Sequence, residues 1–331
     1  MNPNPPSRLS ALHVAPGEGQ CESLVLALQA VLRACGRDVD YDELAAATGV
    51  AFMTTRAVGE PDPRRWPAHG RHAFLVPAAR MYGLELRDLH PPGAAPLPRT
   101  PPEFAGHFRD SYLPFVAGAV ARGEPVLAWM GWPSPHELEW GIITDIDAAS
   151  GRCLGCPAGL AGPRVPLAGP PVQVYVVQGG AAGDPSPRDL LQAALERAAV
   201  ILDNRLDPSF GVVTGQPAML DWHTALSDAL GRVPGAPDPA AFHPLLARVY
   251  VSGRGAAVRF LERFRVSGAP ARPAAIDACI AAYRQAVAGL EPACDPRGVS
   301  AALDSESARQ ELLEALSRAI ECERRAAEAL R

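Results

Sequence analysis

The chain has 331 residues and a formal net charge of −5, and it contains no lysine, so all 31 basic residues are arginine. This acidic balance argues against a nucleic-acid-binding protein, because no basic surplus remains for phosphates. No apolar run reaches the ~18 residues that cross a bilayer, and the N-terminus lacks the hydrophobic stretch of a signal peptide. We therefore expect a cytoplasmic protein without a membrane partner, whose seven cysteines stay reduced.

The first half of the chain combines helical and strand patterns. A helix is predicted over residues 20–34, because Leu24, Leu28 and Leu32 recur at helical spacing with Cys21 on the same stripe. Residues 54–70 are polar and proline-containing, and are predicted to be a loop. Further helices are predicted at 40–48, 72–82 and 100–122, the last kinked at Pro114, and strands at 125–130, 140–147 and 172–178.

The second half of the chain lacks strand patterns. Residues 179–187 are rich in glycine and proline and are predicted to be a linker. Helices are predicted after it, at 188–204, 216–231, 240–264, 272–290 and 300–330. Four arginines are expected to form a basic face that is solvated or, as an alternative, binds an anion, namely Arg254, Arg259, Arg263 and Arg265. We predict an α+β domain with an antiparallel sheet at 1–180, followed by an all-α helical bundle domain at 187–331.

A cysteine that opens a helix, followed far along the chain by a polar group leading into a strand, is typical of a thiol active site. The positive end of the helix dipole is expected to lower the pKa of Cys21. Such a thiol also needs an imidazole that carries protons and a third group that orients the imidazole. His136 precedes the predicted strand 140–147, and Asp145 and Asp147 lie near its end, so these residues are the candidates.

Three short stretches of the sequence carry a family resemblance. They are Gly19-Gln-Cys21-Glu-Ser-Leu with the segment 36–52 that follows it, Gly123-Glu-Pro-Val-Leu-Ala-Trp129, and Glu139-Trp-Gly-Ile-Ile-Thr-Asp-Ile-Asp147. These stretches resemble the N-terminal domain of the butirosin-biosynthesis acyltransferase family, which is similar in turn to the bacteriocin-leader peptidases of the papain-like superfamily. The resemblance implies a papain-like cysteine-peptidase-type fold, with Cys21 as nucleophile, a histidine just before the strand and a carboxylate in or after it.

This sequence departs from the family pattern in three places. Glu139 occupies the position expected for the histidine, Asp145 stands where glycine is usual, and Gln20 directly precedes the cysteine instead of lying several residues earlier. Three interpretations stay open. In the first, His136 accepts the proton of Cys21, and Asp147 or Asp145 orients His136. In the second, Glu139 itself faces the thiol, where its negative charge would disfavour the thiolate. In the third, the site is an inactive pocket used for binding.

Aromatic residues are the main candidates for a substrate pocket. Trp129, Trp132 and Trp140 cluster around two predicted strands, where they would form an aromatic wall or, more simply, part of the core. Gln20 and Asp145 are the other candidate substrate-binding residues, and Trp66 would cover the same cleft as a lid.

The leading functional hypothesis is a cysteine-dependent acyltransferase or an amide or thioester hydrolase of a natural-product or peptide-modification pathway. Its substrate would be a small-molecule or peptide acyl group, with a carrier protein as one candidate donor. The rival hypothesis is a binding module that has lost its proton shuttle, and a third is a structural subunit whose helical half forms homo-oligomers. Cys153-Leu-Gly-Cys156 has no second ligand pair nearby, so no metal and no cofactor is predicted.

Overall fold

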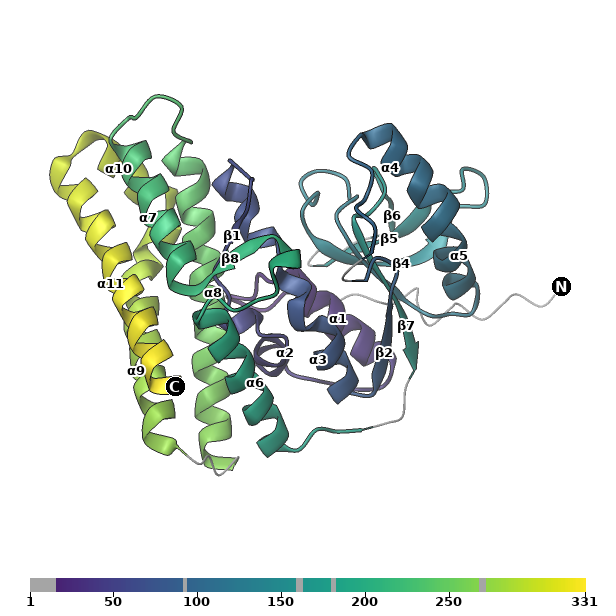
Figure 1. The fold of residues 1–331 in the computed structure, drawn as a ribbon, viewed down its shortest axis with the longest axis horizontal. Coiled ribbons are helices and arrows are strands. Elements are labelled where there is room, and N and C mark those ends of the chain that lie inside the picture. Colours follow the sequence, from purple (N-terminus) through teal and green to yellow (C-terminus); the bar gives the residue numbers. More distant parts are fainter. Residues whose placement is uncertain (1–15, 92–93, 159–162, 180–182, 268–271) are drawn as a thin grey trace. The chain divides into compact units, whose positions relative to one another are not determined.

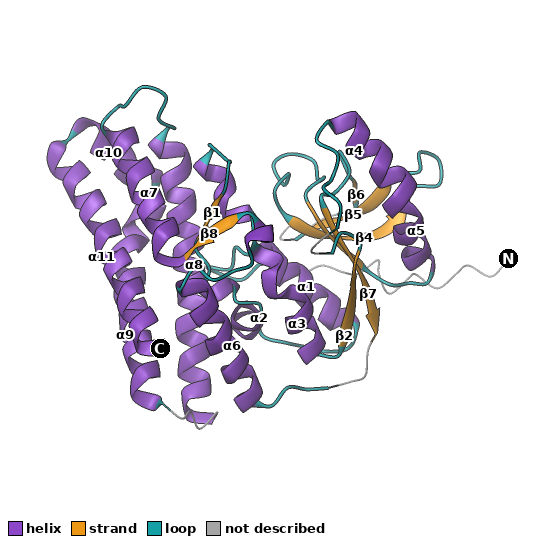
Figure 2. Cartoon of the chain, in the orientation of Figure 1, coloured by secondary structure: helices purple, strands orange, loops and turns teal. Residues whose placement is uncertain are grey.

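A computed structural model describes residues 16–91, 94–158, 163–179, 183–267 and 272–331. It shows a protein of helices and strands whose main sheet is antiparallel (Figures 1 and 2). The described chain divides into two compact units that take alternating segments of the sequence. The first contains Ser23–Asp40 and Val76–Asp184, and the second contains Gly19–Glu22, Tyr41–Leu75 and Pro185–Arg331.

The division into units is not the contiguous one expected from the sequence. One boundary, between Asp184 and Pro185, falls inside the predicted linker, but Tyr41–Leu75 groups with the C-terminal half. Helix α2 (Tyr41–Ala47) and the 3-10 turn η2 (Val50–Phe52) contact α8 (Pro239–Ser267). The apolar residues of this early segment are therefore buried by a helix that lies far along the chain.

The first unit is built on a six-stranded antiparallel sheet in the order β2-β7-β3-β4-β5-β6. The strands are β2 (Leu84–Asp88), β3 (Val126–Trp129), β4 (Trp140–Ile146), β5 (Cys153–Pro157), β6 (Val165–Pro166) and β7 (Gln173–Gly179). The strands predicted from sequence, β3, β4 and β7, are the central ones whose residues are mostly buried. The flanking strands β2, β5 and β6 were not predicted, because they are short and only partly apolar.

The helices in this part of the chain are α1 (Ser23–Ala34), α3 (Leu75–Met81), α4 (Pro101–His107) and α5 (Leu113–Ala121). Of these, α1 and α5 contact the sheet. A π-helical turn joins α4 to α5 just before Pro114, as expected where proline cannot donate a helical hydrogen bond. Helix α5 packs on β3, β4 and β7, where Val116 joins Val126 and Ile143 in the core, while α1 contacts β4.

The second unit consists mainly of helices that begin where prolines do. Backbone N–H groups in the first turn of a helix have no acceptor within the helix, so proline, which lacks an N–H, is tolerated there. Helices α6, α8, α9 and α10 all start with proline. Besides α2 and α8, the helices are α6 (Pro187–Leu202), α7 (Gly215–Leu230), α9 (Pro273–Leu290), α10 (Pro296–Asp304) and α11 (Glu306–Leu330). Short 3-10 turns are η3 (Pro63–Ala68), η4 (Arg71–Phe74), η6 (Pro208–Phe210) and η7 (Glu291–Cys294).

The expected all-α character of the C-terminal half is wrong in one respect. Strand β8 (Val212–Thr214) pairs antiparallel with β1 (Thr55–Ala57), with Val213 opposite Arg56. The segment 54–70, predicted to be a loop, thus supplies a strand that only a partner from the far half of the chain can complete. Within the described ranges, no helix is both long and apolar enough to cross a membrane.

A buried ion pair joins the helices of the second unit. Arg254, expected on a solvated basic face, is instead fully buried, and its Nε lies 2.5 Å from Oε1 of the buried Glu323 on α11. Tyr250 donates a hydrogen bond to the same oxygen at 2.7 Å, and the Arg254 guanidinium also donates to the Ala51 carbonyl at 2.9 Å and to the Thr54 hydroxyl at 3.0 Å. Because all these groups are out of water, each is costly to leave unpaired.

We predict that Glu323→Ala lowers the free energy of unfolding by about 3–5 kcal/mol, because it leaves the Arg254 charge buried without a partner. Urea denaturation followed by circular dichroism measures the change. Glu321→Ala is the matched control, since Glu321 pairs with Arg324 at the surface, where solvent screens the charges, and should leave stability nearly unchanged. A loss below about 1 kcal/mol in Glu323→Ala would contradict the role given to the ion pair.

Candidate functional site

His136 lies in the loop that connects β3 to β4 in the first unit. Two hydrogen bonds hold this loop closed. The Met130 backbone N–H donates to the Glu139 carbonyl at 3.0 Å, and the Trp129 indole N–H donates to the Leu138 carbonyl at 3.0 Å. Met130 takes the left-handed conformation, with φ 66°, where the chain leaves β3. These hydrogen bonds therefore fix the conformation of the loop that carries the side chains of residues 136 and 139.

The side chains of His136 and Glu139 form a pair. Nδ1 of His136 lies 2.9 Å from Oε1 of Glu139, and both side chains are partly exposed. An ionised carboxylate can only accept, so Nδ1 carries the hydrogen and Nε2 keeps a free lone pair. Burial raises the pKa of Glu139, and the hydrogen bond from His136 partly offsets that rise. The arrangement is the one by which a carboxylate orients a catalytic imidazole.

The aspartates predicted to stand behind His136 do not do so. Asp147 accepts hydrogen bonds from the Ala149 N–H at 3.1 Å and from the Ser150 hydroxyl, which lower the pKa of its carboxyl. Asp145 is ion-paired with Arg164 at 2.7 Å. The prediction is wrong because β4 separates Asp145 and Asp147 from Glu139 by roughly 20 and 26 Å, at ~3.3 Å per residue of strand. The carboxylate for His136 is Glu139, directly before the strand.

The three tryptophans predicted to line a substrate pocket are core residues. Trp129, Trp132 and Trp140 are at most 6% exposed. The rings of Trp129 and Trp140 stack with centroids 6.3 Å apart, and Trp140 also stacks on Tyr175 at 6.1 Å. Trp132 lies against β4, where a Cβ on Gly141 would come within 2.4 Å of the indole. The prediction of an aromatic substrate wall is therefore wrong for these side chains, which instead fix the sheet and the base of the loop.

Cys21 belongs to the second unit and precedes α1 by two residues, instead of opening it. Its surface is exposed, but enough protein surrounds the sulfur that desolvation, helped by the charge of Glu22, raises the pKa of the Cys21 thiol to about 12. A hydrogen bond with Ser252 and the charges of Arg71 and Arg248 oppose this rise only in part. The expectation that a helix N-terminus lowers the pKa of Cys21 is therefore wrong, because desolvation outweighs the dipole.

The segment that holds Cys21 is anchored by polar contacts. Ser252 on α8 donates a hydrogen bond to the Gly19 carbonyl at 2.5 Å, and the Glu22 N–H donates to the Tyr41 hydroxyl at 3.1 Å. Gln20, predicted to bind substrate, is half-buried in the same segment. The sequence did not indicate Ser252 or Tyr41, because they come from helices remote in the chain and match no local motif.

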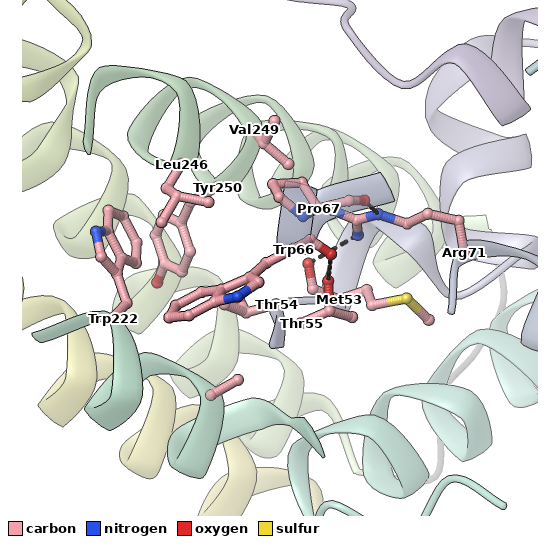
Figure 3. A pocket seen from close by; sticks show the side chains of 11 residues that line it. Met53, Thr54, Thr55, Trp66, Pro67, Arg71, Trp222, Leu246, Val249 and Tyr250 are labelled. Atoms are coloured by element: carbon pink, nitrogen blue, oxygen red, sulfur yellow. Dashed lines mark hydrogen bonds between the residues drawn. The ribbon is translucent and has the colours of Figure 1, made fainter. Parts of the chain in front are cut away.

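Glu22 and Arg71 form a second buried ion pair. Their closest atoms, Glu22 Oε1 and Arg71 Nη2, lie 3.3 Å apart, although the angle does not make a hydrogen bond. Arg71 also donates to the Pro67 carbonyl at 2.6 Å and to the Met53 carbonyl at 3.1 Å, as Figure 3 shows. The pKa of Glu22 is raised by burial and lowered by Arg71. Arg71 therefore balances the carboxylate next to the thiol.

The cavity beside Arg71 is small. Figure 3 shows the ring of Trp66 in it, with Trp222 and Tyr250 on one side and Arg71 on the other. Its volume of about 20 Å³ accommodates roughly one water molecule. Trp66, expected as a lid, is buried and donates its indole N–H to the Glu60 carbonyl at 2.9 Å. Cys21 lines neither this cavity nor the larger hollow of about 450 Å³ beyond Trp66.

No group of three or more acidic, histidine or cysteine residues suited to a metal ion occurs among the residues that the structure describes. Cys153 and Cys156 lie on β5, with Cys153 buried and Cys156 partly exposed. Comparison with protein-family models and with curated protein sequences finds no match for this chain. The assignment of a function therefore depends on the geometry of the thiol and of the imidazole–carboxylate pair.

We predict that Gly141→Ala destabilises the first unit by about 1–3 kcal/mol, because the added Cβ would overlap Trp132 and the Cys156 carbonyl, 2.4 and 2.5 Å away. Thermal unfolding followed by tryptophan fluorescence measures the loss. Gly179→Ala is the control, since a Cβ there meets nothing within 4 Å. Equal stability of the two variants would show that the close approach of Trp132 to β4 is mistaken.

We predict that alkylation of Cys21 by iodoacetamide keeps accelerating above pH 9, without a plateau near the pKa of free cysteine. A thiol whose pKa is raised to about 12 stays protonated at neutral pH, so at pH 8 the reaction should be at least about a hundredfold slower than for free cysteine. Peptide mass spectrometry quantifies labelling at Cys21. Glu22→Gln should move the profile to lower pH, whereas the exposed Glu18→Gln should not. A plateau below pH 8.5 would overturn the raised pKa.

Proposed function

We propose that this protein is a cysteine-dependent acyltransferase or an amide or thioester hydrolase. In this proposal Cys21 is the nucleophile, His136 is the general base and Glu139 is the carboxylate that orients His136. The observation that carries the proposal is the 2.9 Å contact between His136 Nδ1 and Glu139 Oε1. It supports His136 as the imidazole of the site, because this histidine lies three residues before Glu139 in the same loop and contacts its carboxylate.

The first unit supports a papain-like assignment in its layout. It has an antiparallel sheet with α1 against β4, and the Trp140 N–H donates to the Ser23 hydroxyl at 3.0 Å. Cys21 precedes Ser23 by two residues, and Glu139 precedes Trp140 by one.

The raised pKa of the Cys21 thiol favours general-base catalysis over a stable thiolate–imidazolium pair. His136 Nε2 takes the thiol proton as sulfur bonds to the acyl carbon, and the carbonyl π electrons move to oxygen. The tetrahedral intermediate expels the amine or thiolate leaving group, which receives the proton from His136. Water or an acceptor nucleophile then attacks the acyl-enzyme in the same way and regenerates the thiol.

The alternative function, a binding module without turnover, is favoured by one observation. The carboxylate nearest in sequence to the thiol is Glu22, whose negative charge raises the pKa of Cys21 and so opposes formation of the nucleophile. In this alternative the protein binds an acyl compound without forming a covalent bond. Intact-mass analysis after incubation with an acyl thioester distinguishes the two, since only the enzyme gains the mass of the acyl group.

We predict that Cys21→Ala abolishes hydrolysis of short acyl thioesters of N-acetylcysteamine and prevents acyl-enzyme formation. His136→Ala should lower kcat/KM by about 10²–10⁴, the usual contribution of a general base. Glu139→Gln should lower it at least about tenfold, because an amide does not hold the imidazole in the required orientation. Thiol release and intact mass are the measurements.

Asp147→Asn is the matched control, because Asp147 lies at the other end of β4 and does not contact His136. It should keep activity within about twofold. Turnover that survives in Cys21→Ala would end the proposal. If Asp147→Asn lowered kcat/KM as much as Glu139→Gln, the role of Glu139 in orienting His136 would be contradicted.

A further inference from the structure

The segment 19–22 lies against one face of α8 in the second unit. Ser252 anchors it through the 2.5 Å hydrogen bond to the Gly19 carbonyl. Arg248 lies one helical turn before Ser252, and residues four apart on a helix share a face. The face of α8 that anchors the Cys21 segment therefore also carries the guanidinium of Arg248, whose charge acts on the Cys21 thiol.

Arg248 differs from the neighbouring arginines of α8 and of the thiol site in its lack of a counter-ion. Arg71 pairs with Glu22, Arg254 with Glu323, and Arg259 with Asp42 at 2.7 Å. Arg248 is exposed, and no carboxylate of the described chain forms a salt bridge with it. Glu22 has the largest charge effect on the Cys21 thiol, and Arg71 and Arg248 oppose it. Of these two arginines, Arg71 is committed to Glu22, whereas Arg248 forms no salt bridge within the described residues.

We propose that Arg248 is a specificity residue that binds an anionic group, a carboxylate or a phosphate, on the acyl substrate of Cys21. The inference rests on the proposed function, because it names the class of substrate that the thiol receives. A guanidinium offers paired N–H donors that fit two oxygens of a carboxylate or phosphate at once. Because Arg248 lies near the thiol, the anionic group that it binds would lie close to the acyl carbon, on a part of the substrate that does not react.

The test uses two small alkylating reagents that differ only in charge. Iodoacetate is anionic and iodoacetamide is neutral; in both reactions the thiolate sulfur bonds to carbon and iodide leaves. The ratio of the two rates at one thiol does not depend on the thiolate fraction, so it reports attraction for the anion alone. Rates at Cys21 and at Cys35 are measured in the same sample by peptide mass spectrometry, at low ionic strength.

Cys35 is an internal control, since it is exposed and lies near Arg37, whose charge is neutralised by Asp184 at 3.0 Å. We expect the iodoacetate-to-iodoacetamide ratio to be about two- to fivefold higher at Cys21 than at Cys35. Arg248→Gln should remove this difference and Arg248→Lys should keep most of it. An equal ratio at the two thiols, or a ratio unchanged in Arg248→Gln, would overturn the proposal.

A second arm identifies the anion. Succinate and inorganic phosphate are tested separately as protectants of Cys21 against iodoacetamide, in the wild type and in Arg248→Gln. Protection by one of them that is lost in the variant supports the proposal and says which oxygen acid is preferred, whereas equal protection of both proteins contradicts it. Neither arm requires turnover, so failure of the anion site and failure of Cys21 as nucleophile are separate outcomes.

Discussion

The buried ion pair between Arg254 and Glu323 is the interaction on which the second unit depends. It joins α8 to α11, and the remaining guanidinium donors reach Ala51 and Thr54, so segments far apart in the sequence share one charge pair. The pair also sets the rotation of α8 about its axis. Because Arg254 points into the bundle, Ser252 and Arg248 lie roughly on the opposite side of the helix, at about 100° per residue, where Ser252 meets the Cys21 segment.

Two carboxylate pairs of the structure differ in burial and in the contacts of their partners. The Glu22–Arg71 pair is almost completely buried, and its guanidinium is further committed to two backbone carbonyls, so it serves as a fixed charge balance next to the thiol. The Glu139–His136 pair is partly exposed and engages only one ring nitrogen, which leaves Nε2 for proton transfer. The difference in burial separates an ion pair that holds structure from one suited to catalysis.

Local patterns predicted most helices and the central strands. Prolines at helix starts, the apolar stripe of Leu24, Leu28 and Leu32, and the buried strands β3 and β4 all act within a few residues, which is the range that sequence periodicity covers. The predictions that failed concern long-range partners. Arg254 was expected in solvent, because no local pattern reveals that a glutamate on another helix will accept its charge.

The amino-acid sequence alone determined the positions of most helices and of the central strands β3, β4 and β7, and it indicated Cys21, His136 and Glu139 as the residues to examine. Tertiary structure alone decided that Glu139, and not Asp147, stands behind His136, that the tryptophans are core, and that desolvation raises the pKa of Cys21. The physical reason is range. Hydrogen bonding along a helix or strand depends on neighbours in sequence, whereas desolvation and charge pairing depend on every segment that folds against a group.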